Sequence, residues 1–276
     1  MIQSCVVHTD RETYLSCTRC GRPACADCLI PASVGFHCRE CVAVANTQTP
    51  RVRTARRYTP FLTFIFIGIS VLGYLLQEVD STIFNKLALV GYAQYADGTW
   101  LGVANGEWYR LATVALLHGG ILHLLFNMYA LWAIGTSLES VIGRWRFGAI
   151  YVVSLLGGSS ASLLFNASNI PAVGASGAIF GLFGATVIVN RRGGLNAASM
   201  YTVIAINLAM GFVIPNVDWH AHLGGLLFGA ASTALFVAGP AHKWLGGRIA
   251  GILLLLLVAF FLDSQRVTEL QLLVGQ

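Results

Sequence analysis

Residues 60–77 read PFLTFIFIGISVLGYLLQ and contain no charged side chain. An α-helix needs roughly 20 apolar residues to cross the hydrocarbon core of a bilayer, and this stretch is close to that length. Further apolar stretches follow at 113–137, 147–165, 175–190, 199–214, 220–238 and 248–262. The sequence therefore predicts an all-α polytopic membrane protein with seven membrane helices.

The composition agrees with a protein built for lipid. Of the 276 residues 56% are hydrophobic and 11% are charged, whereas about a quarter of the residues in a soluble domain are charged. The net charge of +5 does not gather on one basic face, because most cations fall in short loops between apolar stretches. We therefore expect a lipid bilayer as a partner and no nucleic acid.

The loop charges predict the orientation, because Lys and Arg concentrate in cytosolic loops. Cations precede the first stretch and follow the second, fourth and sixth: Arg51, Arg53, Arg56, Arg57, Arg144, Arg146, Arg191, Arg192, Lys243 and Arg248. The opposite loops carry Glu78, Asp80, Asp97, Glu107 and Asp218. This pattern predicts a multi-pass protein of the plasma or inner membrane, with a cytosolic N-terminus and an outer C-terminal tail from Asp263.

All seven cysteines precede residue 42, so residues 1–45 are expected to form a separate module, joined by a basic linker at 46–59. Residues 1–20 lack the apolar core of a signal peptide, which favours a cytosolic location. In a reducing compartment, clustered cysteines bind metal more often than they form disulfides. Disulfides and unliganded thiols are the alternatives.

Four pairs of ligand-type residues, each with two residues between its members, occupy this module. A two-residue spacing lets both side chains reach one zinc ion, so eight residues predict two structural zinc sites: Cys5, His8, Cys17, Cys20, Cys25, Cys28, Cys38 and Cys41. His37 is an alternative ligand. The module resembles cross-braced B-box domains, and this resemblance implies that pairs one and three share one ion and pairs two and four the other. We expect it to contact a cytosolic protein or to regulate the chain.

Polar residues gather at one depth of the predicted bundle, although such residues are costly in lipid and therefore indicate function. His118, His123 and Asn127 are placed in the second helix, Ser176 near the outer end of the fourth and His222 near the outer end of the sixth. A histidine can activate a serine by taking its proton. Because no acidic residue falls inside a predicted helix, the sequence predicts a Ser-His dyad.

Two further features suit hydrolysis by this dyad. His123, Asn127 and the backbone N–H of Ser176 are candidate donors to an oxyanion. Gly225 and Gly229 are four residues apart on the sixth helix, and small residues at this spacing let helices approach closely. Glycines 177, 181 and 184 on the fourth helix form the expected matching surface, which would bring Ser176 within reach of His222.

Four motifs in order resemble the signature of rhomboid intramembrane serine proteases. They are Glu107-Trp108-Tyr109-Arg110, the segment HGGILHLLFN from His118 to Asn127, GASG around Ser176, and AHLGGLLFG around His222. The resemblance covers about residues 60–240 and implies a six-helix catalytic core, with 241–276 adding a seventh helix and a tail. It implies Ser176 as nucleophile, His222 as base, and His123 with Asn127 as oxyanion hole. It also implies transmembrane substrates cut near the outer boundary.

Simpler interpretations accompany each of these residues. A lone membrane serine usually bonds a backbone carbonyl one turn earlier, and His220 is expected to be a loop or interface residue. His118 is interpreted as structural or gating, and Arg110 as a donor that anchors the loop at 78–112. The competing functions are a catalytically silent rhomboid-like protein that binds membrane clients, and a receptor or transporter with a zinc module.

Overall fold

The computed structural model describes residues 2–48, 58–94, 98–214, 217–237 and 245–273. The chain divides into two compact units, Met1–Arg57 and Tyr58–Gln276. The basic run from Arg51 to Arg57 lies outside the described residues, as do Asp97 and Lys243. At those positions the membrane orientation is a prediction from the sequence alone.

The first unit is small and built around its cysteines. Two antiparallel ribbons form it, β1 (Gln3–Ser4) with β2 (Glu12–Thr13) and β3 (Leu29–Pro31) with β4 (Phe36–Cys38). A 3-10 turn η1 (Ala26–Cys28) precedes β3, and α1 (Arg39–Gln48) follows β4. Helix α1 extends three residues past residue 45, where the sequence places the end of the module.

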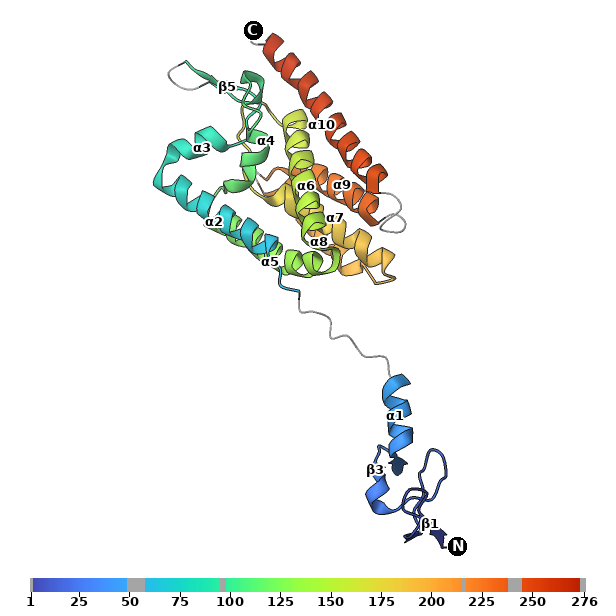
Figure 1. Ribbon diagram of the computed structural model, residues 1–276. Helices are drawn as coiled ribbons and strands as arrows, with labels where there is room; N and C mark the ends of the chain where they lie inside the picture. The colour runs from blue at the N-terminus through green and yellow to red at the C-terminus, as the bar shows by residue number, and fades with distance from the viewer. Residues whose placement is uncertain (1, 49–57, 95–97, 215–216, 238–244, 274–276) are drawn as a thin grey trace. The chain divides into compact units, whose positions relative to one another are not determined.

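Five helices in the described part of the second unit are long and apolar enough to cross a membrane. They are α2 (Leu62–Val79), α5 (Ile121–Ile142), α6 (Arg144–Phe165), α9 (Trp219–Val237) and α10 (Leu245–Leu273). The other two predicted helices are shorter: α7 (Ser176–Arg192) and α8 (Ala198–Val213). Every residue of α7 from Gly177 to Ala185 is buried, since α6 and α9 pack beside it (Figure 1). The chain is a mostly helical, multi-pass membrane protein.

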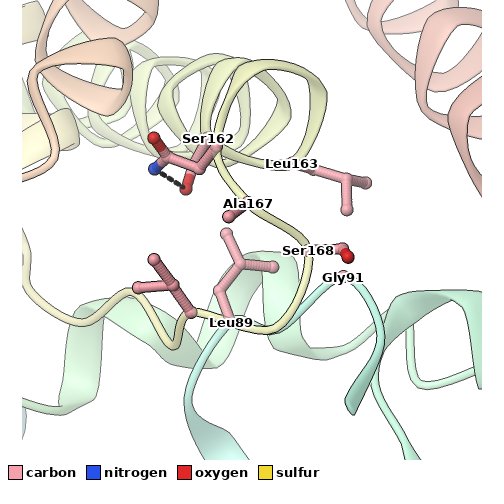
Figure 2. Close-up of a pocket in the computed structure, with 8 residues that line it drawn as sticks. Leu89, Gly91, Ser162, Leu163, Ala167 and Ser168 are labelled. Atoms are coloured by element: carbon pink, nitrogen blue, oxygen red, sulfur yellow. Dashed lines mark hydrogen bonds between the residues drawn. The ribbon is translucent and has the colours of Figure 1, made fainter.

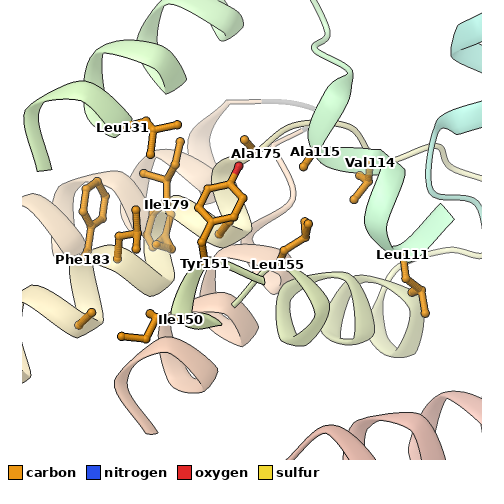
Figure 3. Close-up of a cluster of buried hydrophobic side chains, with 14 of the residues drawn as sticks. Leu111, Val114, Ala115, Leu131, Ile150, Tyr151, Leu155, Ala175, Ile179 and Phe183 are labelled. Carbon is orange, nitrogen blue, oxygen red and sulfur yellow. The ribbon is translucent and has the colours of Figure 1, made fainter. Parts of the chain in front are cut away.

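The hydrophobic core lies where α5, α6 and α7 meet a long first loop, defined here as residues 80–120. Leu131 of α5, Tyr151 of α6 and Phe183 of α7 converge there, and Val114 and Ala115 of the loop cover one end (Figure 3). Arg110, although charged, is only 1% exposed within this loop. The core therefore joins the loop to the helices as one packed body.

The first loop contains several short elements, most of them within 78–112, where the sequence predicts a loop. These are α3 (Ser81–Leu87), β5 (Ala93–Gln94) paired with β6 (Trp100–Leu101), η2 (Val103–Asn105), α4 (Arg110–Thr113) and η3 (Val114–Leu116). The prediction that the second membrane helix starts at 113 was wrong. Gly120 has φ +151, a conformation that interrupts a helix, so α5 begins at Ile121 and His118 lies in the loop before it.

The end of the last helix also differs from the prediction. Helix α10 continues to Leu273 rather than ending at 262, because Val267 and Leu270 pack into the core. Asp263 therefore lies inside a helix, and so does Glu139 in α5. Both are buried, so the expectation that no acidic residue falls inside a membrane helix was wrong.

The buried Glu139 carboxylate is hydrogen-bonded to the start of another helix. Its two carboxylate oxygens accept hydrogen bonds from the backbone N–H groups of Phe61, Leu62 and Thr63, from the Thr63 hydroxyl and from the Tyr58 hydroxyl, at 2.8–3.1 Å. The first N–H groups of a helix have no partner within the helix. Glu139 supplies that partner for α2 and joins the start of α2 to the C-terminal part of α5.

Candidate active site

Ser176 and His222 meet at the ends of two adjacent helices. Ser176 is the first residue of α7, and His222 lies in the first turn of α9. The Ser176 Oγ and His222 Nε2 atoms are 2.9 Å apart, a hydrogen-bonding distance. His222 is 7% exposed and Ser176 is half-buried, so the histidine is largely withdrawn from solvent. A serine hydroxyl bonded to a histidine in this way can be activated as a nucleophile.

Glycines allow α7 and α9 to approach this closely. A Cβ atom added to Gly225 would run into the Gly177 carbonyl, and one added to Gly229 would run into the backbone of Gly181. A Cβ on Gly184 would lie 2.7 Å from the Leu226 carbonyl oxygen. The close approach predicted from the glycine spacing is therefore confirmed, and it sets the separation of Ser176 from His222.

The other side of the His222 ring contacts an aromatic ring and no carboxylate. Phe180 stacks on it with ring centroids 4.1 Å apart and an angle of 8° between the planes. Within the described ranges, the His222 Nδ1 atom has no hydrogen-bond partner. The Asp218 backbone carbonyl accepts a hydrogen bond from the His222 backbone N–H at 3.2 Å, while the Asp218 side chain accepts one from the Ala221 N–H at 3.0 Å. Sequence reasoning missed Phe180, although its place four residues after Ser176 puts it on the same helix face.

His123 points toward the same space as Ser176. A Cβ atom placed on Gly174 would lie 2.8 Å from His123 Cε1, 2.9 Å from His123 Nε2 and 3.7 Å from Ser176 Oγ. The His123 Nδ1 atom accepts a hydrogen bond from the backbone N–H of Gly119 at 3.2 Å. This bond leaves Nε2 to carry the proton in the neutral ring, so Nε2 is available as a donor beside Ser176.

Asn127 and His118 are placed differently from His123. The Asn127 side-chain amide donates to the His123 carbonyl one turn earlier, at 2.9 Å. To donate to an oxyanion, Asn127 would use the second N–H of its amide or change its rotamer. The His118 ring is fully buried and meets the His123 ring edge to face at 5.2 Å. Gln77 binds both backbone groups of His118, which fits a structural role.

Arg110 anchors the first loop, as the sequence predicted. Its guanidinium donates to the backbone carbonyls of Asn85 and Ala88, at 2.8 and 2.7 Å, and to Glu107 at 2.8 Å. Burial raises the pKa of Glu107, but hydrogen bonds from Arg110 and the Gly102 N–H outweigh it, so this pKa is below its usual range. His220 Nδ1 lies 2.7 Å from Asn166 Oδ1, so His220 ties α9 to the loop after α6.

The eight predicted metal ligands form two groups in the first unit. Cys5, His8, Cys25 and Cys28 make one, and Cys17, Cys20, Cys38 and Cys41 make the other, with the ligand atoms of each group within 4.8 Å of one another. This is the pairing that the cross-brace resemblance implies. Among the described residues His37 belongs to neither group. Both groups could hold a metal ion.

The distances inside these groups suit a tetrahedral ion. Two sulfurs bound tetrahedrally at about 2.3 Å from zinc lie about 3.8 Å apart, and the Cys20 and Cys38 sulfurs are 3.8 Å apart. His8 Nδ1 lies 3.4 and 3.3 Å from the sulfurs of Cys25 and Cys28. Backbone hydrogen bonds, chiefly at Cys25 and at Cys38, lower the pKa of Cys5 and of Cys17 to about 6. Thiolates, the form that binds metal, are favoured at Cys5 and Cys17. Burial raises the pKa of Cys28 to about 11, and the hydrogen bond with Cys38 raises that of Cys41 to about 12.

Comparison with known proteins agrees with this architecture. The model of the rhomboid domain family matches residues 105–239. The rhomboid YdcA of Bacillus subtilis is 35% identical over 203 residues, which cover 71% of this chain and 98% of YdcA. The chain belongs to the rhomboid family. The family assignment thus confirms the resemblance drawn from the four motifs.

Two other relatives are longer than this chain. The rhomboid protease GluP of Bacillus subtilis is 39% identical over 211 residues, or 74% of this chain and 40% of GluP. RHOMBOID-like protein 4 of Arabidopsis thaliana is 38% identical over 155 residues, or 53% of this chain and 38% of that protein. The chain therefore matches about two fifths of the length of each.

Proposed function

We propose that this rhomboid is an intramembrane serine endopeptidase that cleaves transmembrane segments with a dyad of Ser176 and His222. The observation that carries the proposal is the 2.9 Å approach of Ser176 Oγ to His222 Nε2 inside the helix bundle. Two relatives at 35% and 39% identity are rhomboids of bacteria, and the one at 39% is named a protease. The dyad supplies the residues that such a reaction needs.

In the proposed reaction His222 takes the proton of the Ser176 hydroxyl as Oγ attacks the carbonyl carbon of the scissile peptide bond. The resulting imidazolium then gives that proton to the leaving amine, which leaves an acyl-enzyme for water to hydrolyse by the same steps. Phe180 stacks on the imidazole and holds the plane of the ring, a task that a carboxylate performs in triads.

The oxyanion of the tetrahedral intermediate needs donors that are already in place. His123 Nε2 lies beside the space next to Ser176 Oγ, and Asn127 lies one turn further along α5. The backbone N–H of Ser176, the first residue of α7, is a further candidate donor. One well-placed donor lowers the barrier by about 3–4 kcal/mol. We assign His123 and Asn127 to this oxyanion hole.

We further propose that cleavage takes place in the outer half of the membrane. Arg144 comes directly after the C-cap of α5, and Arg191 and Arg192 lie in the last turn of α7, so these helix ends face the cytosol by the positive-inside rule. Ser176 and His222 lie at the opposite ends of α7 and α9. Single-span membrane proteins of the plasma or inner membrane, cut near their outer boundary, are the substrates that this depth favours.

The direct test is cleavage of a single-span substrate in proteoliposomes. Wild type should release a fragment whose new terminus maps to the outer half of the transmembrane segment, whereas Ser176→Ala and His222→Ala should release none. The alternative is a catalytically silent rhomboid-like protein that binds membrane clients. It predicts capture of the substrate without a fragment, and equal behaviour of the three proteins.

For the first unit we propose two structural zinc ions, one in each Cys/His group, within a cytosolic interaction module. Four filled protein positions suit structural rather than catalytic zinc. With few apolar residues of its own, the unit would draw folding free energy from the metal. Metal analysis of the purified chain should give two zinc ions, and one ion or none would contradict the cross-braced pair. The zinc-loaded chain, used as bait in a pull-down, would test whether the first unit binds a cytosolic protein.

A further inference from the structure

Asp263 carries a carboxyl group in α10, the longest of the described helices, directly after the apolar stretch that ends at Leu262. It is 2% exposed, and its Oδ2 atom accepts a hydrogen bond from the Ser160 hydroxyl of α6 at 2.7 Å. An acidic residue inside a membrane helix is expensive. We therefore ask what the hydrogen bond to α6 provides that an apolar side chain would not.

The neighbouring serine of α6 points to what that role is. Ser159, one residue before Ser160, donates to the Leu111 carbonyl of the first loop at 2.7 Å. Both serines are buried. Ser159 of α6 thus binds the first loop, and the next residue, Ser160, binds α10. These two hydrogen bonds fix the positions of the first loop and of α10 relative to α6.

On both sides of Asp263 helix α10 contacts the first loop. The Gln271 side chain donates to the Ala104 carbonyl at 2.8 Å, and the Trp108 and Phe260 rings meet with centroids 5.3 Å apart. Val267 and Leu270 pack into the common core. Sliding α10 by even one residue would break these contacts together, since a helix rises 1.5 Å per residue.

The first loop in turn holds the segment that leads to Ser176. Leu89 and Ala172 exchange two backbone hydrogen bonds, at 3.0 and 2.8 Å, and the Tyr92 N–H donates to the Ser168 carbonyl at 2.8 Å. Figure 2 shows Leu89 and Gly91 of the loop facing Leu163, Ala167 and Ser168. The Gly174 N–H donates to the Val114 carbonyl at 2.9 Å. Two residues later comes Ser176.

We infer that Asp263 is a positioning residue which pins α10 to α6 and makes α10 a brace for the first loop and the segment 167–175. The brace acts on Ser176 through the first loop and touches neither the dyad nor the substrate. Its effect on cleavage rests on the proposed proteolytic function, whereas its effect on the loop does not.

Hydrogen–deuterium exchange of the backbone amides tests the brace without any substrate. The amides of Leu89, Tyr92, Ala172 and Gly174 report directly on the loop contacts. In a Ser176→Ala background, Asp263→Leu and Ser160→Ala should each raise exchange at these amides about threefold, the factor expected for one interhelical polar contact in a membrane. Asp263→Asn keeps an acceptor oxygen and should restore protection.

Ser264→Ala is the matched control on the same helix. The Ser264 side chain is half-buried and its hydroxyl donates to the Phe260 carbonyl of its own helix, so its removal should leave exchange unchanged. Unchanged exchange in both Asp263→Leu and Ser160→Ala would overturn the inference. Should Asp263→Leu fail to fold, Ser160→Ala decides alone, because it changes one small side chain on α6.

Activity provides the second measurement. In proteins that retain Ser176, the loss of the brace should lower kcat several-fold more than it changes KM, because the segment leading to Ser176 is displaced. If cleavage is absent in wild type while exchange still responds to Asp263, the proteolytic proposal fails and the brace stands. If cleavage is normal and exchange does not respond, the brace fails alone.

Discussion

Replacement of Gly174 by alanine is predicted to damage the active site more than the fold. Gly174 has φ +123, where a residue with a side chain is strained by on the order of 1–3 kcal/mol. In addition, its new Cβ would lie 2.8 and 2.9 Å from two atoms of the His123 ring. Because the new Cβ is fixed to the backbone whereas the His123 ring is a side chain that can rotate, the ring is expected to turn away from Ser176.

The expected magnitude follows from the donor that is lost. Without one oxyanion donor kcat falls roughly 10²–10³-fold. Gly143→Ala is the matched control, because Gly143 has φ +84 but no neighbour within 4 Å of an added Cβ. It should share the backbone strain, and thus a lower melting temperature, while keeping near-normal cleavage per folded molecule.

The assay compares kcat for one transmembrane substrate in proteoliposomes, normalised to folded protein. Gly174→Ala should fall at least about 100-fold below Gly143→Ala. Equal rates in the two variants would refute the placement of His123 as a donor beside Ser176. KM should change little in both, since neither glycine contacts the substrate in the proposed reaction.

Three further predictions concern other contacts. Phe180→Leu removes the ring stacked on His222 and should lower kcat about 2–10-fold, the equivalent of a stacking energy of about 0.5–1.5 kcal/mol; an unchanged rate would show that the ring does not orient His222. Glu139→Gln weakens the charged acceptor at the start of α2 and should lower the melting temperature by about 3–10 °C, whereas an unchanged value would contradict a stabilising cap. Removal of metal with a chelator should make residues 2–48 sensitive to protease. The melting temperature of the second unit, followed by the fluorescence of its tryptophans, should stay the same, since this unit carries all six. A fall in that melting temperature on metal removal would contradict two independently folded units.

Much of the fold follows from local sequence patterns. Long apolar stretches predict helices because a bilayer leaves the backbone no other way to satisfy its hydrogen bonds. The stretch at 60–77 corresponds to α2, and the glycine spacing on α9 predicts its contact with α7. These features depend on residues close together in the chain.

The errors concern features that depend on distant partners. The start of α5 was placed too early because apolarity at 113–118 serves the packing of the first loop rather than a helix. Glu139 and Asp263 looked like residues outside the membrane, since a carboxylate is expensive in lipid. Their partners, the start of α2 and Ser160, are 76 and 103 residues away and leave no local signal.

In the candidate site, too, features set by nearby residues were predictable and features set by distant partners were not. Ser176, His222 and His123 could be selected by residue type and predicted depth. Phe180 was missed because a phenylalanine in a membrane helix is ordinarily a packing residue, and its parallel stacking on His222 depends on how α7 and α9 cross. The metal groups were predictable because each pair is local and the pairing between them follows a known type of module.

The most direct measurement is the mass-spectrometric location of the adduct formed by a serine-reactive fluorophosphonate in detergent. A Ser-His dyad predicts one adduct, on Ser176, in wild type, with none in Ser176→Ala and a strong loss in His222→Ala. Absence of an adduct on Ser176 in wild type, or labelling that is the same in His222→Ala, would contradict the account.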